Sequence, residues 1–140
     1  MTALTASKGV RRRDGEFFSR GVAANAKIFA GAIVCLSAGF AVKGTSALNL
    51  IADGVAEESV DNTGGAAGAI AVQTRPGNHY CVNSLAADLI TVAEIGTDCF
   101  IVDDQTVAKT SGGGTRSRAG KILDVDAANG VLVAIGILKG

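Results

Sequence analysis

The chain has 140 residues, enough for one domain that buries roughly two-thirds of its unfolded surface, and its thirteen basic and thirteen acidic side chains cancel. Of its residues 48% are hydrophobic but only 4% are aromatic, so the apolar content is mostly Ala, Val, Ile and Leu. Short β-branched runs separated by nineteen glycines argue against a helical bundle and predict an all-β fold, a small antiparallel barrel or sandwich. A glycine-rich backbone loses much entropy on folding, which contacts between subunits would offset, so we expect an oligomer.

The charge is distributed unevenly along the chain. Residues 1–20 contain five basic and two acidic side chains, so this stretch carries +3 (5 − 2) and the remainder −3. We therefore expect an extended basic arm over residues 1–27 and a β body over residues 28–140. Such an arm can bind nucleic acid, an acidic lipid surface or an acidic protein groove, or remain solvated; its cations lack interleaved aromatic rings, which argues against nucleic acid. The candidate partner-binding residues of the arm are its cations and its phenylalanine pair: Lys8, Arg11, Arg12, Arg13, Phe17, Phe18 and Arg20.

Cysteine usage indicates a reducing compartment. Cys35, Cys81 and Cys99 form no CxxC pair and cannot complete a zinc site with the single His79 at a familiar spacing, so we expect buried thiols and no metal. The apolar stretch 28–42 has fifteen residues, fewer than the ~20 needed to cross a bilayer as a helix. We interpret it as two strands and expect a soluble protein, made in the cytoplasm, with no membrane partner.

Taken in chain order, short extended runs alternate with turn signals. We expect a turn at Ser37–Ala38–Gly39, a short helix or turn near 91–95 with a second helical turn conceivable at 86–88, and an Asn129–Gly130 turn near the end. The expected extended segments are 32–36, 40–42, 48–56, 57–60, 69–75, 79–82, 99–102, 106–108, 121–126 and 131–135. At most one short helix is predicted, and the spacing is typical of a small barrel or sandwich.

The stretch from Asp53 to Gly77 gives the clearest local pattern, strand, glycine turn, strand. Residues 61–65, DNTGG, supply the positive-φ geometry of a hairpin connection, and extended structure resumes at 69–75. Ile70, Val72 and Thr74 share one face of that second strand, as in a half-buried antiparallel strand. The stretch is predicted to be scaffold.

No catalytic or ligand-binding pattern emerges. Asp103–Asp104 and the pair Asp124 and Asp126 lack the DxDxDG spacing of a calcium loop, and aspartates in turns are explained by hydrogen bonds to the local backbone. Glu57–Glu58 are neighbours on a strand and face opposite ways, so they cannot flank one bond as an acid–base pair. The glycine clusters lack the phosphate-loop order GxxxxGK[ST]. We expect a protein that is not an enzyme and needs no cofactor.

Four segments together look like the small capsid decoration, or cement, proteins of tailed bacteriophages, a family often known only as a domain of unknown function beside the major head protein. They are GVAEESVDNTGGAAGAIAVQTRPG, NHYCVNS, AEIGTDCFIVDDQTVAKT and RSRAGKILDVDAANGVLVAI. The resemblance covers about residues 26–136 and is most specific at 57–65, 102–107 and 119–122. The arm over residues 1–25 is longer and more basic than the family pattern.

The resemblance implies a structural virion protein on the exterior of the expanded capsid. It would bridge subunits of the major capsid protein, act as a homo-oligomer, commonly a trimer, and bind no nucleic acid directly. Glu57 and Glu58 are candidate groups that face the capsid lattice. Two alternatives stay open: a small trimeric β enzyme of the dUTPase type, for which the lone Tyr80 lacks the nucleotide-binding context, and a nucleic-acid-binding β-barrel that uses Arg11–Arg13.

Overall fold

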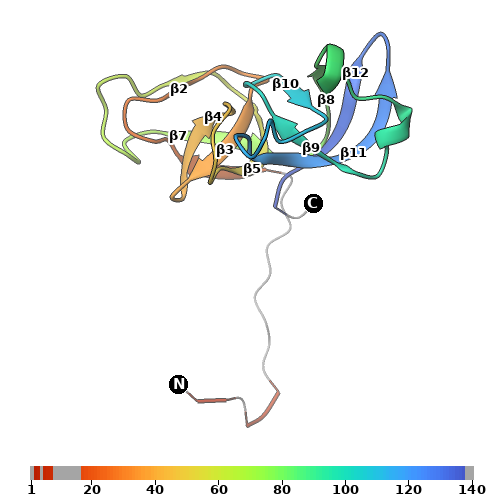
Figure 1. Ribbon diagram of the computed structural model, residues 1–140. Coiled ribbons are helices and arrows are strands. Elements are labelled where there is room, and N and C mark those ends of the chain that lie inside the picture. Colours follow the sequence, from red (N-terminus) through yellow and green to blue (C-terminus); the bar gives the residue numbers. More distant parts are fainter. Residues whose placement is uncertain (1, 4, 8–16, 138–140) are drawn as a thin grey trace.

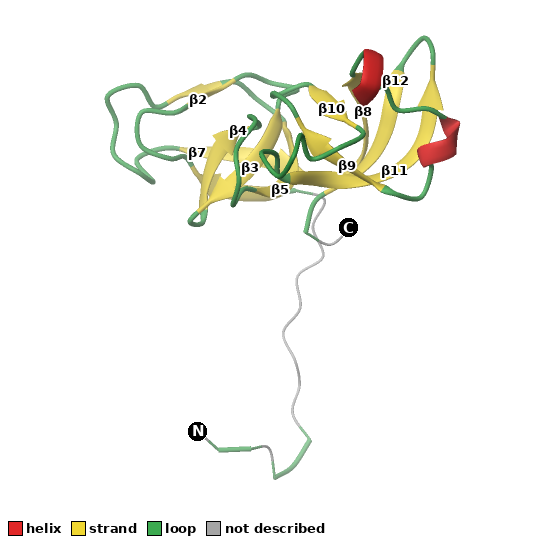
Figure 2. Ribbon diagram, viewed as in Figure 1, coloured by secondary structure: helices red, strands yellow, loops and turns green. Residues whose placement is uncertain are grey.

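The computed structural model describes residues 2–3, 5–7 and 17–137, and their fold is all-β, which confirms the predicted class (Figure 1). The strands form two lobes that lie side by side. One lobe is a five-stranded antiparallel sheet accompanied by a two-stranded ribbon, and the other is a closed five-stranded barrel. Helical structure in the described residues is limited to two single 3-10 turns between two barrel strands (Figure 2).

The sheet lobe contains the first strands of the chain. Its sheet has the order β1 (Phe18–Gly21), β7 (Ala71–Arg75), β5 (Ile51–Ala56), β3 (Ile33–Ser37), β4 (Phe40–Lys43). A bridge between Val22 and Ala41 brings the chain after β1 against β4, so the two edges of this sheet approach each other. The ribbon pairs β2 (Lys27–Ile28) with β6 (Val60–Asp61).

The barrel lobe contains the second half of the chain. Its closed order is β10 (Thr106–Ala108), β8 (Gly77–Asn83), β12 (Gly130–Ile135), β11 (Arg118–Asp126), β9 (Asp98–Ile101). All of these ladders are antiparallel except the short β8–β10 pair, which is parallel and closes the barrel. The turns η1 (Ala86–Asp88) and η2 (Val92–Glu94) lie between β8 and β9, where the sequence indicated helical turns.

Strand β3 joins the two lobes into one body. Its side chains alternate, as in any strand: Ile33 and Cys35 enter the core of the barrel, whereas Val34 enters the core of the sheet lobe. All three are buried. Because one strand supplies both cores, the lobes share their packing.

The β3–β4 hairpin forms as predicted. Ser37 pairs with Phe40, so the loop is two residues long, and its residues Ala38 and Gly39 both have positive φ, 50° and 88°. Two positive φ values are the signature of the tight turn whose twist matches that of the flanking strands. Glycine meets this requirement at Gly39 without strain.

The strand–turn–strand predicted across residues 53–77 is confirmed in part. Val55 and Ala56 at the end of β5 pair antiparallel with Arg75 and Thr74 of β7, but the residues directly before the turn form β6, which pairs with β2. The turn after β6 is tied down by Asn62, which is buried and whose Nδ2 donates to the carbonyl oxygens of Ala23 and Ala66, both at 3.0 Å. The expected face of β7 is confirmed, since Val72 and Thr74 are buried.

The predicted boundary between arm and body at residue 27 does not coincide with the edge of the fold. Strand β1 pairs with β7 from Phe18 to Gly21, and β2 begins at Lys27. Within the segment assigned to the arm, the body therefore starts by Phe18.

Candidate functional site

The base of the N-terminal arm is fastened to the sheet by a buried carboxylate. Arg20 on β1 donates from Nε and Nη2 to the two oxygens of Asp53 on β5, both at 2.8 Å. The Thr74 hydroxyl on β7 donates to the same carboxylate at 2.7 Å. Asp53 is only 1% exposed. A buried carboxylate is stable when it is paired and hydrogen-bonded in this way, so the three contacts tie both β1 and β7 to β5.

The phenylalanine pair packs against arginines of its own chain. The Arg20 guanidinium lies 4.7 Å from the ring centroid of Phe18, and that of Arg75 lies 5.7 Å from the centroid of Phe17. Nε of Arg75 also donates to the Glu57 carboxylate. Both distances are in the range of cation–π attraction. These contacts therefore help to hold the first residues of the body against the sheet.

The predicted partner-binding residues thus fall into four groups. Phe17 and Glu57 both contact Arg75. Phe18 contacts Arg20, whose guanidinium also binds Asp53. Glu58 is exposed and has no hydrogen bond or ion pair with the described residues. Four residues lie outside the described part of the chain: Lys8, Arg11, Arg12 and Arg13.

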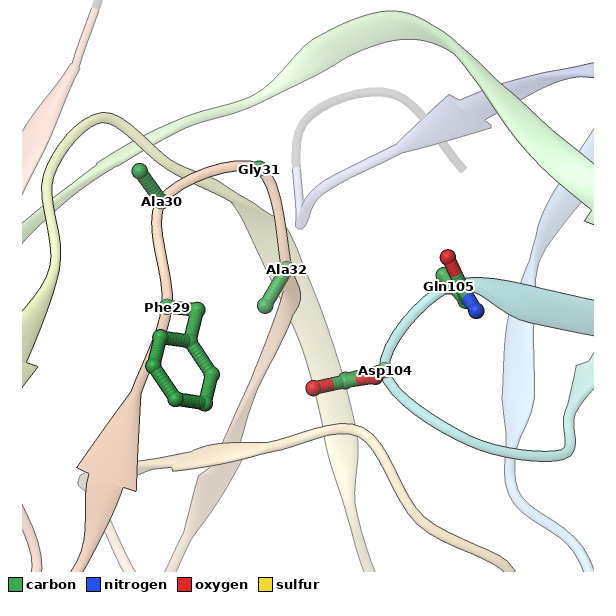
Figure 3. Close-up of a pocket in the computed structure, with 6 residues that line it drawn as sticks. All are labelled: Phe29, Ala30, Gly31, Ala32, Asp104 and Gln105. Atoms are coloured by element: carbon green, nitrogen blue, oxygen red, sulfur yellow. The ribbon is translucent and has the colours of Figure 1, made fainter.

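A crevice separates the two lobes on one side of the molecule. It is about 190 Å³ in volume and is lined by the 29–32 connection between β2 and β3 and by the Asp104–Gln105 turn between β9 and β10 (Figure 3). A second hollow of about 210 Å³ shares Gly31 and Gln105 with it and extends to Tyr80 and Val82 on β8. The two hollows adjoin at these shared residues and together are called the inter-lobe crevice below.

The walls of the inter-lobe crevice are held by backbone hydrogen bonds. Ile33 N donates to Asp104 O at 2.8 Å, and Val82 N donates to Gln105 O at 2.7 Å. The β9–β10 turn is therefore fastened to the sheet lobe on one side and to β8 on the other. A depression built on fixed strands is preformed, which lowers the entropic cost of binding.

The two aspartates at the rim of the crevice have different surroundings. Asp103 Oδ1 accepts hydrogen bonds from the amides of Gln105 and Thr106, at 2.9 and 2.8 Å. Burial alone would raise the pKa of Asp103, but these bonds favour the charged form and hold its pKa below the usual value. Asp104 is half-buried, and its carboxylate accepts no hydrogen bond from the described residues and points into the gap facing Phe29 and Ala32 (Figure 3).

The barrel lobe presents large apolar side chains to solvent. They surround η1 and η2 and continue onto β8 and β11; we call them the barrel apolar surface, and its residues are Tyr80, Val82, Leu85, Leu89, Val92, Ile95 and Leu123. Leu85 and Val92 are 82% and 70% exposed. A groove of about 390 Å³ runs between the end of β8, Leu85 and the β11–β12 turn. Large apolar side chains exposed in this number on one lobe are typical of a site of protein association.

The groups that could carry covalent or metal chemistry are engaged or buried. Burial raises the pKa of the Cys35, Cys81 and Cys99 thiols to about 12 in each case, with the Asp53 carboxylate adding to the shift at Cys35. His79 Nε2 lies 3.0 Å from the Arg75 carbonyl oxygen. Within residues 2–3, 5–7 and 17–137, no three His, Cys, Asp or Glu side chains are grouped to hold a metal ion. The helical turns of the same residues are too short to cross a bilayer.

Sequence reasoning missed three residues of this site. Asp53 lies within a strand of small and apolar residues, IADGVA, and an acid in such a run is a signal for a buried ion pair that the sequence offered. Phe29 and Asp104 belong to segments far apart in the sequence, and nothing local indicates that they meet.

No protein-family model, curated protein or solved structure matches the chain.

Proposed function

We propose that this protein is a structural virion protein that decorates the outside of an expanded bacteriophage capsid and bridges subunits of the major capsid protein. The observation that carries the proposal is the barrel apolar surface, in which Leu85 and Val92 are largely exposed in the single chain. Exposed apolar area of this extent is stabilised when a protein partner covers it. The resemblance to the decoration family implies that this partner is the capsid lattice, and that copies of the chain associate with one another in a trimer.

The shape of the molecule is consistent with a cement function. Two lobes share strand β3 and form one body, and the start of that body is fastened by the Arg20–Asp53 pair. A rigid body loses little conformational entropy on docking, so more of the contact energy stabilises the complex. A protein that binds only the expanded lattice shifts the capsid toward that state by mass action, and many copies act together.

The proposal is tested by co-sedimentation of the purified protein with shells assembled from its proposed partner, a phage major head protein. We expect binding to expanded shells and little binding to unexpanded ones. The double variant Leu85→Ser, Val92→Ser should bind at least about tenfold more weakly, the loss expected when a few well-packed apolar contacts of a hot spot are removed.

Leu48→Ser is the matched control, because Leu48 is 55% exposed but belongs to the connection between β4 and β5 and not to the barrel apolar surface. It should bind as the unaltered chain does. Absence of binding to both kinds of shell would contradict the proposed function. Hydrolysis of a nucleoside triphosphate, or salt-sensitive binding to nucleic acid, would instead favour one of the two alternatives from the sequence.

A further inference from the structure

Asp104 is distinguished from the other carboxylates by its lack of a partner. Among the acidic side chains of the described residues, only Asp104 and Glu58 form no hydrogen bond or ion pair with that part of the chain. Glu58 is exposed, where water satisfies it, but Asp104 is half-buried at the crevice wall. A partly desolvated carboxylate is stabilised by a donor, and a cationic one gives the larger gain.

The remaining walls of the inter-lobe crevice select the kind of cation. Phe29, opposite Asp104 in Figure 3, is 57% exposed, and Tyr80 lies at the far end of the depression. An aromatic face beside a carboxylate suits the planar guanidinium of arginine, which stacks on the ring and offers a fork of donors to the carboxylate. Lysine can offer only a strongly hydrated point charge.

One cation is already near the crevice. Lys27 Nζ lies 5.1 Å from the Phe29 ring centroid, and its backbone pairs with Asp61. Lys27 forms no ion pair with Asp104 within the described part of the chain. The Asp104 carboxylate therefore remains available to a second cation.

The sequence supplies arginines in a run, and the charges are complementary. Arg11, Arg12 and Arg13 precede the body, whereas residues 17–137 hold eleven acidic and eight basic side chains, a surplus of three negative charges (11 − 8). Strand β1 begins beside Pro76 and Ile137, at the end of β8 opposite to Val82. The six residue steps from Pro76 to Val82 span ~20 Å, close to the full extended reach of the six steps from Arg11 to Phe17. The chain's own arginines could therefore reach the crevice only as a straight arm, while those of a neighbouring copy have no such limit.

We propose that the inter-lobe crevice is a guanidinium site that binds an arginine of the Arg11–Arg13 run of a second copy of this chain, between Asp104 and the Phe29 ring. The arm of each copy then joins it to a neighbour. This inference deepens the proposed function, since it names how copies are linked, but it concerns the purified protein and is tested without capsids.

The test is disulfide trapping between two variants of the full chain that each gain one cysteine, Arg12→Cys and Gln105→Cys. Gln105 is exposed in the crevice, and the native thiols are buried with pKa values near 12, so they stay silent under mild oxidation. We expect the mixed proteins to form a covalent heterodimer. Ala128→Cys is the control partner, because Ala128 is exposed in the barrel groove and not in the crevice.

Removal of the carboxylate measures the contribution of Asp104. Adding Asp104→Ala to the Gln105→Cys chain should lower the heterodimer yield roughly three- to tenfold, the loss of one partly desolvated charge pair next to an aromatic ring. Asp124→Ala in the same chain should leave the yield unchanged, because Asp124 is exposed on β11 and accepts a hydrogen bond from the backbone amide of Val125.

The outcomes distinguish the arm of a second copy from the chain's own arm as the occupant of the inter-lobe crevice. A heterodimer that exceeds the Ala128→Cys control and depends on Asp104 supports the proposal. Cross-linking only within a chain that carries both cysteines would show that the chain's own arm fills the crevice, and would overturn it. A yield equal to the control in both formats, or one indifferent to Asp104→Ala, would also overturn it. Shell binding that persists in any of these cases leaves the proposed function standing, so the two failures are distinguishable.

Discussion

The two lobes are stabilised by different means, although they share strand β3. The barrel core consists of Ile, Val, Cys and Ala. Among the described residues of the barrel lobe, the buried polar side chain is that of Ser117, directly before β11. The sheet lobe buries Asp53, Asn62 and Thr74 beside a smaller apolar core. Apolar burial tolerates any partner of the right shape, whereas buried polar groups accept only the arrangement that satisfies them. The barrel therefore supplies stability, and the sheet lobe fixes which strands are neighbours.

The barrel should show the larger response to loss of apolar volume. Ile101 on β9 is fully buried in the barrel core. Ile101→Ala should lower the free energy of unfolding by about 3–4 kcal/mol, through lost transfer free energy and the cavity left behind. Urea denaturation followed by circular dichroism measures this change.

The control for that variant is Ile101→Val, which removes one methylene and should cost about 1 kcal/mol. A loss below 1 kcal/mol for Ile101→Ala would contradict the view that close apolar packing stabilises the barrel.

The sheet lobe should respond most to loss of one charge of a buried pair. Asp53→Ala leaves the Arg20 guanidinium and the Thr74 hydroxyl without their acceptor. Removing one partner of a buried pair costs about 3–5 kcal/mol, and because Arg20 is 26% exposed we expect a smaller loss of about 2–3 kcal/mol. Thiol labelling across a urea series is the measurement: all three native thiols enter the barrel core, but Cys35 lies on β3, the strand that both lobes share, whereas Cys81 and Cys99 lie on strands of the barrel alone.

The double variant Arg20→Met, Asp53→Leu separates charge from packing. It should regain much of the lost stability, because replacing both members of a buried pair by apolar groups is often neutral. If the double variant is no more stable than Asp53→Ala alone, the uncompensated arginine is not the cause. Since β3 serves both cores, all three cysteines should become reactive over the same range of urea; earlier exposure of Cys35 would show that the lobes unfold separately.

The comparison also shows which features the sequence determines locally. The β3–β4 hairpin was predictable because its turn depends on Ala38 and Gly39 alone, and the faces of β7 were predictable because alternation is a property of one strand. The pairing of β6 was not predictable in this way. The residues from Asp61 to Gly65 have the composition of a hairpin turn, but Asn62 donates to the carbonyl oxygen of the distant residue Ala23 as well as to that of nearby Ala66.

The same distinction between local and distant contacts applies to the candidate site. The basic composition of the arm and the role of Asp103 in its turn could be predicted from the sequence, because both depend on neighbours along the chain. The inter-lobe crevice was not, because Phe29 and Asp104 come together only when β3 is fastened to the β9–β10 turn through the Ile33–Asp104 hydrogen bond. Asp53 lay between these cases: its place in an apolar strand indicated burial, but its partner Arg20 had been assigned to the arm.

The smallest expected effect is an acid sensitivity in the turn of the barrel lobe. Because hydrogen bonds hold the pKa of Asp103 below its unfolded value of about 3.9, its charged form stabilises the fold above that pH, and this contribution is lost as the pH falls through the folded pKa. Asp103→Asn removes it, so the drop in melting temperature between pH 7 and pH 3 should be smaller in this variant than in the unaltered chain. Glu58→Gln, at a carboxylate with no hydrogen bond to the described residues, is the control and should leave the drop unchanged. An Asp103→Asn variant with the full drop would show that the turn contributes nothing to the pH dependence.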